Sequence, residues 1–359
     1  MKKVLSLALL AAMCAAWLCG CAPSSSSGSG SSGSSGNSSS SQSSSADASK
    51  PDEFAQTPTW EFPLSTSHQP TSVIVQTLEE YCEAIYQNTK GQLKLNLFPA
   101  SQIATEKDGL LMMSQDELEF ACHGSTPIDM FCPQYNFFTA PFLFNSIEHM
   151  QNLLDGELGN QFKDALRENN IETLGTTVIG FRELLSNKDV NSIEDVQGLK
   201  LRIPEIPTWQ KIWSALGANP MPIVASERYT ALQNHVVDAT EGTWENNATN
   251  SFFEVCDYAI ETNHVPEFYA IYASKATLDT LPEDIQQIVR ETSEEYTRLM
   301  GERCRAADAR DRQTLIDKGM DLHEIDLTNF WEKAGETYSE YFQNEWSFTS
   351  YEDIMSYAP

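Results

Sequence analysis

Residues 180–247 read GFRELLSNKDVNSIEDVQGLKLRIPEIPTWQKIWSALGANPMPIVASERYTALQNHVVDATEGTWENN. Two arginines of this stretch, Arg182 and Arg202, each lie in a segment typical of a strand edge or of the loop beyond it. Because the chain as a whole is strongly acidic, cations placed at strand ends indicate a site for an anion. We therefore take an anionic ligand held by these arginines as the working hypothesis for the function.

The charge of the chain excludes one large class of partner. Its 359 residues carry 23 lysines and arginines against 51 aspartates and glutamates, a formal net charge of -28. Nucleic-acid binding depends on basic residues that neutralise phosphates, so no nucleic-acid partner is expected. With 41% hydrophobic residues, the chain is long enough for one large core or two moderate ones.

The cysteines predict no metal site. Three of the eight fall within the first 21 residues, and Cys82, Cys122, Cys132, Cys256 and Cys304 show no zinc-like spacing. A disulfide such as Cys122–Cys132 is one alternative, and buried free thiols are the other. We expect neither a metal nor a cofactor.

The first segment predicts export. Residues 1–20 combine two lysines, an apolar run and small residues, which is typical of a secretory signal peptide. The apolar run is shorter than the roughly 20 residues that span a bilayer. Its end, Leu18-Cys19-Gly20-Cys21, resembles the lipobox of bacterial lipoproteins, which implies that Cys21 is acylated. Residues 21–57 would then be the lipidated cysteine and a Ser/Gly-rich linker that anchors an extracytoplasmic domain to the cell membrane.

Beyond the linker the pattern alternates between strands and helices, as in an α/β domain. Strands are expected at 60–64, 93–98, 118–122, 173–179, 199–203, 236–240, 258–262 and 268–274. Helices are expected at 70–90, 105–114, 146–170, 208–216 and 225–233, with an amphipathic tail over 327–357. Pro282 opens a helical segment that runs to about Lys318, roughly 55 Å, which is longer than one small domain is wide.

Polar loops at the ends of the predicted strands supply further candidates. Ligands of open α/β sheets lie at the carboxyl ends of the strands. His68 lies in the loop after the first strand, and His123 and Ser125 follow the strand that ends at Cys122. Glu241 and Trp244 follow the strand at 236–240. Trp209 lies on a helix four residues from Trp213, so at least one of the two indoles is expected in the core.

Several motifs together closely resemble one known family. G-F-R, S-I-E-D-V-Q-G-L-K-L-R-I-P, L-G-A-N-P-M-P, S-E-R-Y-T-A-L-Q and V-V-D-A-T-E are similar to the DctP-type solute-binding proteins of tripartite ATP-independent periplasmic (TRAP) transporters. The motifs G-Q-L-K, P-A-S-Q-I and A-P-F-L-F resemble its first lobe. The similarity runs from about residue 60 to the C-terminus.

The resemblance implies a periplasmic-binding-protein-like α/β fold of type II with two lobes and a long helix across both. Lobe I would comprise residues 58–179 and 266–300, and lobe II residues 180–265 and 301–359. The implied function is capture of a small organic acid through a salt bridge from Arg202, assisted by Arg182, and its delivery to the small and large membrane subunits of a TRAP permease. A guanidinium fork matches the two oxygens of a carboxylate.

The chain also departs from the family pattern. Gly242 stands where relatives often carry an asparagine that contacts the ligand, and Trp244 or Asn246 could fill that space. The expected ligand-binding set is Arg202, Arg182, Glu241, Trp244, His123, Ser125, His68 and Trp209, with no catalytic residue. These departures argue against a sialic-acid-like specificity and predict a roomier or differently shaped pocket.

Two other functions are weighed against this receptor. An extracellular hydrolase is disfavoured because the chain has no G-x-S-x-G or H-E-x-x-H motif. A binding protein of an ABC-type transporter is the other alternative, and the L-K-L-R-I-P run and the late long helix argue against it. An enzyme is therefore not expected.

Overall fold

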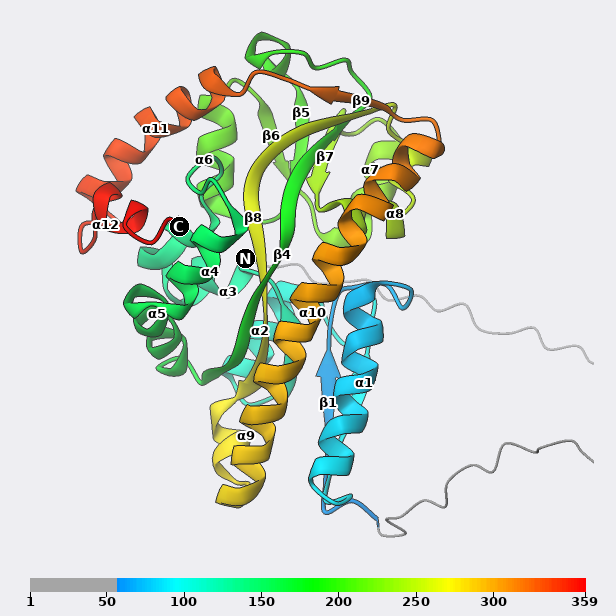
Figure 1. The fold of residues 1–359 in the computed structure, drawn as a ribbon, viewed down its shortest axis with the longest axis vertical. Helices are drawn as coiled ribbons and strands as arrows, with labels where there is room; N and C mark the ends of the chain where they lie inside the picture. The colour runs from blue at the N-terminus through cyan, green and yellow to red at the C-terminus, as the bar shows by residue number, and fades with distance from the viewer. Residues whose placement is uncertain (1–56) are drawn as a thin grey trace, which may run out of the picture. The chain divides into compact units, whose positions relative to one another are not determined.

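The computed structural model describes residues 57–359, in which helices pack on both sides of a mixed β-sheet (Figure 1). The predicted signal peptide, Cys21 and nearly all of the Ser/Gly-rich linker lie outside the described residues. None of the helices in residues 57–359 combines the length and the apolar character needed to cross a membrane.

A single mixed sheet of nine strands organises residues 57–359. Along one path its order is β2-β1-β3-β8-β4-β7-β5-β6, and β9 pairs with β8. The strands are β1 (Trp60–Ser65), β2 (Leu93–Phe98), β3 (Phe120–His123), β4 (Ile171–Ser186), β5 (Lys200–Ile203), β6 (Asn219–Pro222), β7 (Ala239–Gly242), β8 (Tyr258–Ser274) and β9 (Asp321–Glu324). The pairs β1–β2, β1–β3, β5–β6 and β5–β7 are parallel, whereas β8 runs antiparallel to β3 and β4.

Two long strands, β4 and β8, join the two ends of this sheet. They pair with each other from Ile171–Ser274 to Ser186–Tyr258. The sequence predicted shorter pieces, a strand that ends at Ile179 and two separate strands at 258–262 and 268–274, and this was wrong. Bulges between Thr173 and Gly175, Val178 and Gly180, and Arg182 and Leu184 let the strands bend and continue.

The helices cover the faces of the sheet. They are α1 (Val73–Asn88), α2 (Glu106–Ser114), α3 (Thr126–Phe131), α4 (Ile147–Asp155), α5 (Glu157–Arg167), α6 (Pro207–Ala215), α7 (Arg228–Gln233), α8 (Trp244–Thr249), α9 (Lys275–Asp279), α10 (Glu283–Asp317), α11 (Thr328–Gln343) and α12 (Tyr351–Met355). The predicted helix 146–170 is two helices, α4 and α5, because Gly156 separates them as C-cap of one and N-cap of the other.

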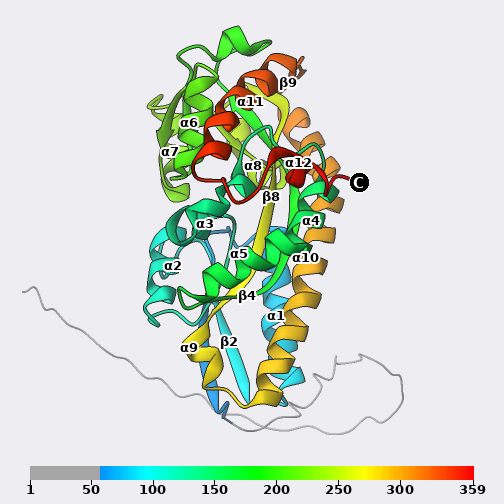
Figure 2. The ribbon, with the colours of Figure 1, turned by 90° about the vertical axis from the view of Figure 1, so that its left-hand side faces the viewer.

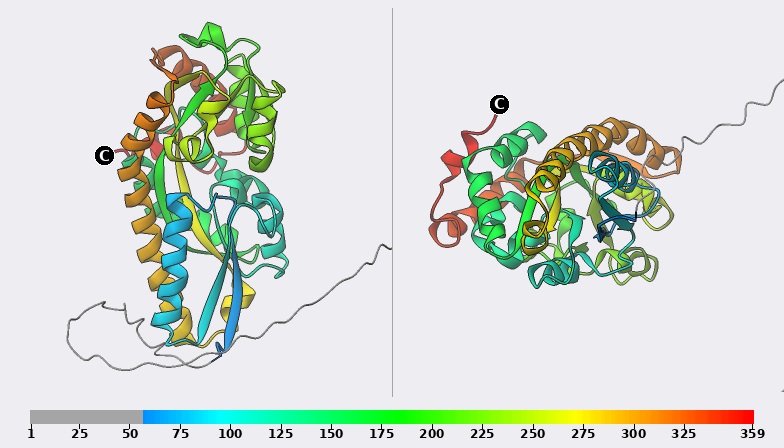
Figure 3. Two further views of the ribbon diagram at one scale, coloured as in Figure 1. Left: turned by 90° about the vertical axis from the view of Figure 1, so that its right-hand side faces the viewer. Right: turned by 90° about the horizontal axis from the view of Figure 1, so that it is seen from below.

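The long helix α10 is present as predicted. Pro282 is its N-cap, Lys318 follows its last residue, and it spans 35 residues. Figures 2 and 3 show α10 running along β4 and β8 with α1 beside its first half. Ile285, Val289 and Met300 of α10 pack with α1 and β1–β3 in one core cluster, whereas Leu315 near its end packs with α7 and α8 in another. The helix thus contacts both ends of the sheet.

The five cysteines among residues 57–359 are free in the structure, including Cys122 and Cys132. All except Cys82 are buried. Burial raises the pKa of the Cys132 thiol to about 12, so the thiolate needed for disulfide exchange is strongly disfavoured at neutral pH.

Candidate functional site

A cavity lies where segments from the two ends of the sheet meet. One side is formed by the loop after β1 and by the first residues of α2 and α3, with His68, Glu106 and Ser125 in its wall. The other side is formed by β5, α6, α7 and α8, which bring Arg202, Trp209, Arg228 and Asn246. Arg182 of β4 and Glu267 of β8 lie between them. The cavity is therefore lined by segments far apart in the sequence.

Arg182 is held by two carboxylates. Its Nε and Nη2 donate to the two oxygens of Glu241, the Nη2–Oε1 distance being 2.9 Å, and Nη2 also donates to the Glu241 carbonyl at 3.1 Å. Its Nη1 donates to Glu267. The guanidinium also lies 5.0 Å from the centre of the Trp209 ring. Nearly every donor of Arg182 is thus committed to the protein.

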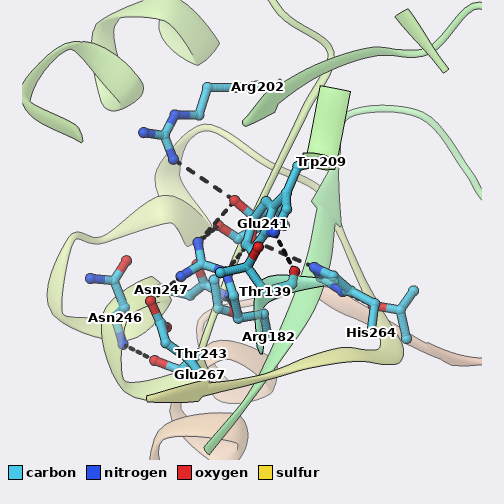
Figure 4. A network of polar contacts seen from close by, with 12 residues as sticks. Thr139, Arg182, Arg202, Trp209, Glu241, Thr243, Asn246, Asn247, His264 and Glu267 are labelled. Atoms are coloured by element: carbon cyan, nitrogen blue, oxygen red, sulfur yellow. Dashed lines mark hydrogen bonds and ion pairs between the residues drawn. The ribbon is translucent and has the colours of Figure 1, made fainter. Parts of the chain in front are cut away.

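Glu241 is the centre of this network. Figure 4 shows the side chains of Arg182, Arg202 and His264 directed at its carboxylate. The group is fully buried, which would raise its pKa, but the Arg182 cation outweighs burial and holds the pKa of Glu241 far below its usual value. Glu241 therefore stays ionised and fixes the arginines rather than facing the cavity.

Arg202 donates hydrogen bonds to a backbone carbonyl, whereas Arg182 donates them mainly to carboxylates. The Nε and Nη2 of Arg202 donate to the carbonyl of Ile223 at 2.8 and 2.5 Å, which fixes the side chain. Its Nη1 lies 3.8 Å from Glu241 Oε1, too far for a hydrogen bond. Burial lowers the pKa of Arg202 to about 10 in spite of Glu241. Arg202 is thus a buried cation in the cavity wall with unused donors.

Arg228 is a third buried arginine of the wall, and it was not among the residues predicted from the sequence. Its guanidinium lies 4.0 Å from the centre of the Phe252 ring, and it donates to the Glu241 carbonyl at 3.1 Å and to the Asn246 side chain. The residue stands inside the S-E-R-Y-T-A-L-Q motif. The position of this arginine inside a motif that resembles the family was the available signal.

Three more of the predicted residues line the cavity. The ring of His68 packs edge-on against the ring of Tyr269, with 4.9 Å between the ring centres. The Nε2 atom of His68 is buried without a hydrogen-bond partner. Burial lowers the pKa of His68 to about 3, so the ring is neutral. Ser125 precedes α3 and its hydroxyl makes no capping bond. The Trp209 indole is almost fully buried and donates to the Thr139 carbonyl at 2.5 Å.

The structure places the other predicted residues outside the cavity wall. Glu241 is fully buried against Arg182 and Arg202. His123 is fully buried because β3 is an inner strand between β1 and β8, and neither of its ring nitrogens has a partner. Trp244 begins α8, which turns the indole into the core formed with Leu185 and Leu315. Of the two residues expected to fill the space at Gly242, Asn246 lies there and Trp244 does not.

Nothing in the described part of the chain resembles a metal centre: no group of three or more His, Cys, Asp or Glu side chains there could hold an ion. The polar atoms of the wall are guanidinium, imidazole, hydroxyl, amide and carboxylate groups. This set can bind an anion and hydrogen-bond to hydroxyl groups.

Comparison with known proteins identifies the family. The family model described as bacterial extracellular solute-binding protein, family 7 (DctP) matches residues 64–345. The chain belongs to the DctP family. This DctP protein is 31% identical, over 247 residues, to a solute-binding protein of Roseobacter denitrificans, with 67% of this chain and 74% of the relative covered. It is also 28% identical to the 2,3-diketo-L-gulonate-binding periplasmic protein of Escherichia coli, over 67% of this chain and 72% of that protein.

Solved structures share the fold of this DctP protein. A TRAP periplasmic solute-binding protein of Sulfitobacter sp. with bound β-D-galacturonate has a TM-score of 0.78 and 26% identity, and covers 83% of this chain and 98% of that one. A TRAP periplasmic solute-binding protein from Fusobacterium nucleatum with bound sn-glycerol 3-phosphate has a TM-score of 0.78 and 25% identity. The match covers 82% of this chain and 96% of that one. The predicted two-lobe receptor fold is confirmed, and these relatives are binding proteins of transporters, not enzymes.

Proposed function

We propose that this receptor captures a small organic acid in the cavity through a salt bridge from Arg202 and delivers it to the small and large membrane subunits of a TRAP permease. Arg182 would support the site by holding Glu241 and Glu267 in place. The remaining wall would hydrogen-bond to the rest of the ligand.

The unpaired donors of Arg202 carry this proposal. The guanidinium is buried, is fixed by the Ile223 carbonyl, and has no carboxylate closer than 3.8 Å among the described residues. A buried cation without a close counter-ion is costly, and an entering carboxylate relieves that cost through charge-assisted hydrogen bonds. Arg182 does not have such free donors for a ligand because Glu241 and Glu267 already accept its hydrogen bonds.

The relatives support an acid as the ligand. The Sulfitobacter homologue holds β-D-galacturonate and the Roseobacter homologue L-galactonate, and both are acids that carry several hydroxyl groups. Ser125, His68 and Glu106 line the side of the cavity opposite Arg202, Glu267 lies between the two sides, and all four could exchange hydrogen bonds with such hydroxyls. A hydroxylated monocarboxylate or dicarboxylate fits this distribution of groups.

Closure of two lobes would complete the site. We take residues 58–179 and 266–300 as lobe I and residues 180–265 and 301–359 as lobe II, so that β4, β8 and α10 cross between them. The cavity is lined from both sets, and a ligand that contacts both would favour the closed arrangement. The permease would recognise that arrangement.

The location follows from the first segment. Members of this family are extracellular or periplasmic binding proteins. We propose in addition that residues 1–20 are a signal peptide and that acylated Cys21 anchors the receptor to the cell membrane.

A ligand screen tests the function. Thermal unfolding of the purified protein would be measured with galactonate, galacturonate, glucuronate, succinate and sn-glycerol 3-phosphate, each at about 100 times an expected micromolar Kd. We expect at least one acid to raise the melting temperature by several degrees, while its neutral amide or ester does not. Equal stabilisation by an acid and its neutral derivative would contradict a site that recognises the negative charge of the ligand.

A further inference from the structure

We propose that Arg228, for which Gly242 leaves room, is a second anion contact and makes the cleft selective for ligands with two negative charges, such as dicarboxylates or phosphate monoesters. This inference rests on the proposed function, because it assigns a ligand class to the same cavity.

The glycine at position 242 is required by its neighbours. A Cβ atom built there would lie 2.8 Å from Asn247 Oδ1, 3.3 Å from Asn246 Oδ1 and 3.4 Å from Arg228 Nη1. The first of these distances is shorter than real Cβ contacts, so a side chain would have to displace its surroundings. The space beside residue 242 is therefore taken by the guanidinium of Arg228 and by two asparagine side chains.

Arg228 has no charged partner in this position. Within residues 57–359 no carboxylate lies within 4.0 Å of it, and its hydrogen bonds go to a carbonyl and to an amide oxygen. The residue is only 5% exposed, yet it lines the cavity. A guanidinium has five N–H donors, and only two of its nitrogens, Nη1 and Nη2, make a hydrogen bond here. Donors therefore remain for an anionic group of a ligand.

The charges around the cavity decide what such a ligand can be. Arg182 is balanced by Glu241 and Glu267, so Arg202 and Arg228 are the cations left to face a ligand, with Glu106 in the opposite wall. Burial lowers the pKa of Arg228 well below its usual value, and the nearby Arg202 adds to this. A guanidinium nevertheless keeps its proton at neutral pH. Two neighbouring buried cations are stabilised more by a dianion than by a monoanion.

The two glutamates of the wall can adjust to that charge. Burial raises the pKa of both Glu106 and Glu267. A dianion entering beside them would raise both pKa values further. Glu106 accepts from the backbone N–H of Gly124 at 3.2 Å, which fixes its carboxyl group in the cavity wall.

Matched ligand pairs test the inference. Binding to the purified protein would be measured by calorimetry for galactarate against galacturonate, for succinate against succinamate, and for sn-glycerol 3-phosphate against glycerate. The first member of each pair is the dianion. We expect the wild-type protein to prefer the dianion about tenfold or more in at least one pair. The preferred pair also separates a dicarboxylate from a phosphate ester.

Variants assign the preference to Arg228. Arg228→Gln is expected to weaken binding of the dianion about tenfold more than binding of the monoanion, which removes the preference. Gly242→Asn, whose side chain would crowd Asn247, Asn246 and the guanidinium of Arg228, is expected to lower the preference as well. Arg305→Gln is the matched control, because Arg305 also donates to a backbone carbonyl, that of Val178, without lining the cavity, and it should keep the preference.

The outcomes separate the two proposals. Failure of every acid to bind would contradict the proposed function together with this inference. Equal affinity for the two members of every pair, or an equal loss for both in Arg228→Gln, would overturn this inference alone. Circular dichroism and thermal unfolding of the variants without ligand would establish that each one is folded.

Discussion

The Nη1 atom of Arg202 lies 3.8 Å from Oε1 of Glu241, whereas Arg182 donates to both oxygens of the same carboxylate. One glutamate therefore faces two arginines but neutralises only one at hydrogen-bond distance. The other arginine keeps donors free at the cavity wall. We infer that the two arginines have different roles, Arg182 in stability and Arg202 in ligand binding.

Replacement of Arg182 should destabilise the fold. Arg182→Gln leaves the fully buried Glu241 charged and without its bidentate partner, and breaking such a pair costs about 3–5 kcal/mol. The free energy of unfolding would be measured by denaturant titration. The double variant Arg182→Gln/Glu241→Gln should recover part of the loss because the buried charge of Glu241 is removed together with that of its partner. A loss below about 1 kcal/mol in the single variant would contradict this role.

The pH dependence of stability should include Glu183. Burial, with the charges of Glu261 and Asp308, raises its pKa to about 8 in the folded protein, above the usual 4.5 that the unfolded chain keeps. Between these values the folded state binds more protons than the unfolded state, so the free energy of unfolding falls as the pH rises from about 5 to about 8. Glu183→Gln should reduce this fall, by at most about 1.4 kcal/mol per pH unit. Identical slopes in the two proteins would contradict the assignment.

The sequence predicted most elements of the fold but not their continuity. Helix α10 has a proline start and an amphipathic pattern, so local signals suffice for it. Strand β8 contains Asn263 with φ of 42° and Pro266, which locally indicate a break. The pairing with β4 overrides them through bulges. Strand β6 was missed because two of its four residues are prolines, tolerated at the sheet edge.

The residues of the candidate site were also only partly predictable from local sequence patterns. Arg202, Arg182, His68, Ser125 and Trp209 were expected at the cavity and line it. The position of Trp244 depends on how α8 packs against β4 and α10, which no local pattern contains. Arg228 was missed because its burial is created by Phe252, Asn246 and Gly242, residues that follow it along the chain by up to 24 positions.

Glu245 should influence ligand affinity without contacting the ligand. Its Oε1 accepts from the backbone N–H of Val73 at 3.0 Å and so joins α8 to the start of α1, between the proposed lobes. Loss of that contact in Glu245→Ala would favour the open arrangement and weaken binding by up to about tenfold. Calorimetry with a ligand found in the screen checks this. Glu254→Ala is an exposed control, whose carboxylate accepts a hydrogen bond from the Tyr229 hydroxyl. Unchanged affinity in Glu245→Ala would contradict the closing contact.

Membrane attachment should depend on Cys21. Acylation of a lipoprotein cysteine requires the thiol, so Cys21→Ser should remove the lipid while leaving residues 57–359 unchanged. After expression in a bacterial host with labelled fatty acid, the wild-type protein is expected to incorporate the label and the variant is not. Cys19→Ser serves as the matched control and should incorporate the label. Incorporation of the label into Cys21→Ser would contradict the anchor.

The central claim is that Arg202 binds the carboxylate of the ligand. Calorimetry of wild type and Arg202→Gln with the acid found in the screen tests it most directly. The account predicts at least about a hundredfold loss of affinity, the equivalent of a charge-assisted pair, with an unfolding transition close to that of wild type. Nearly unchanged affinity in a folded Arg202→Gln protein would contradict it.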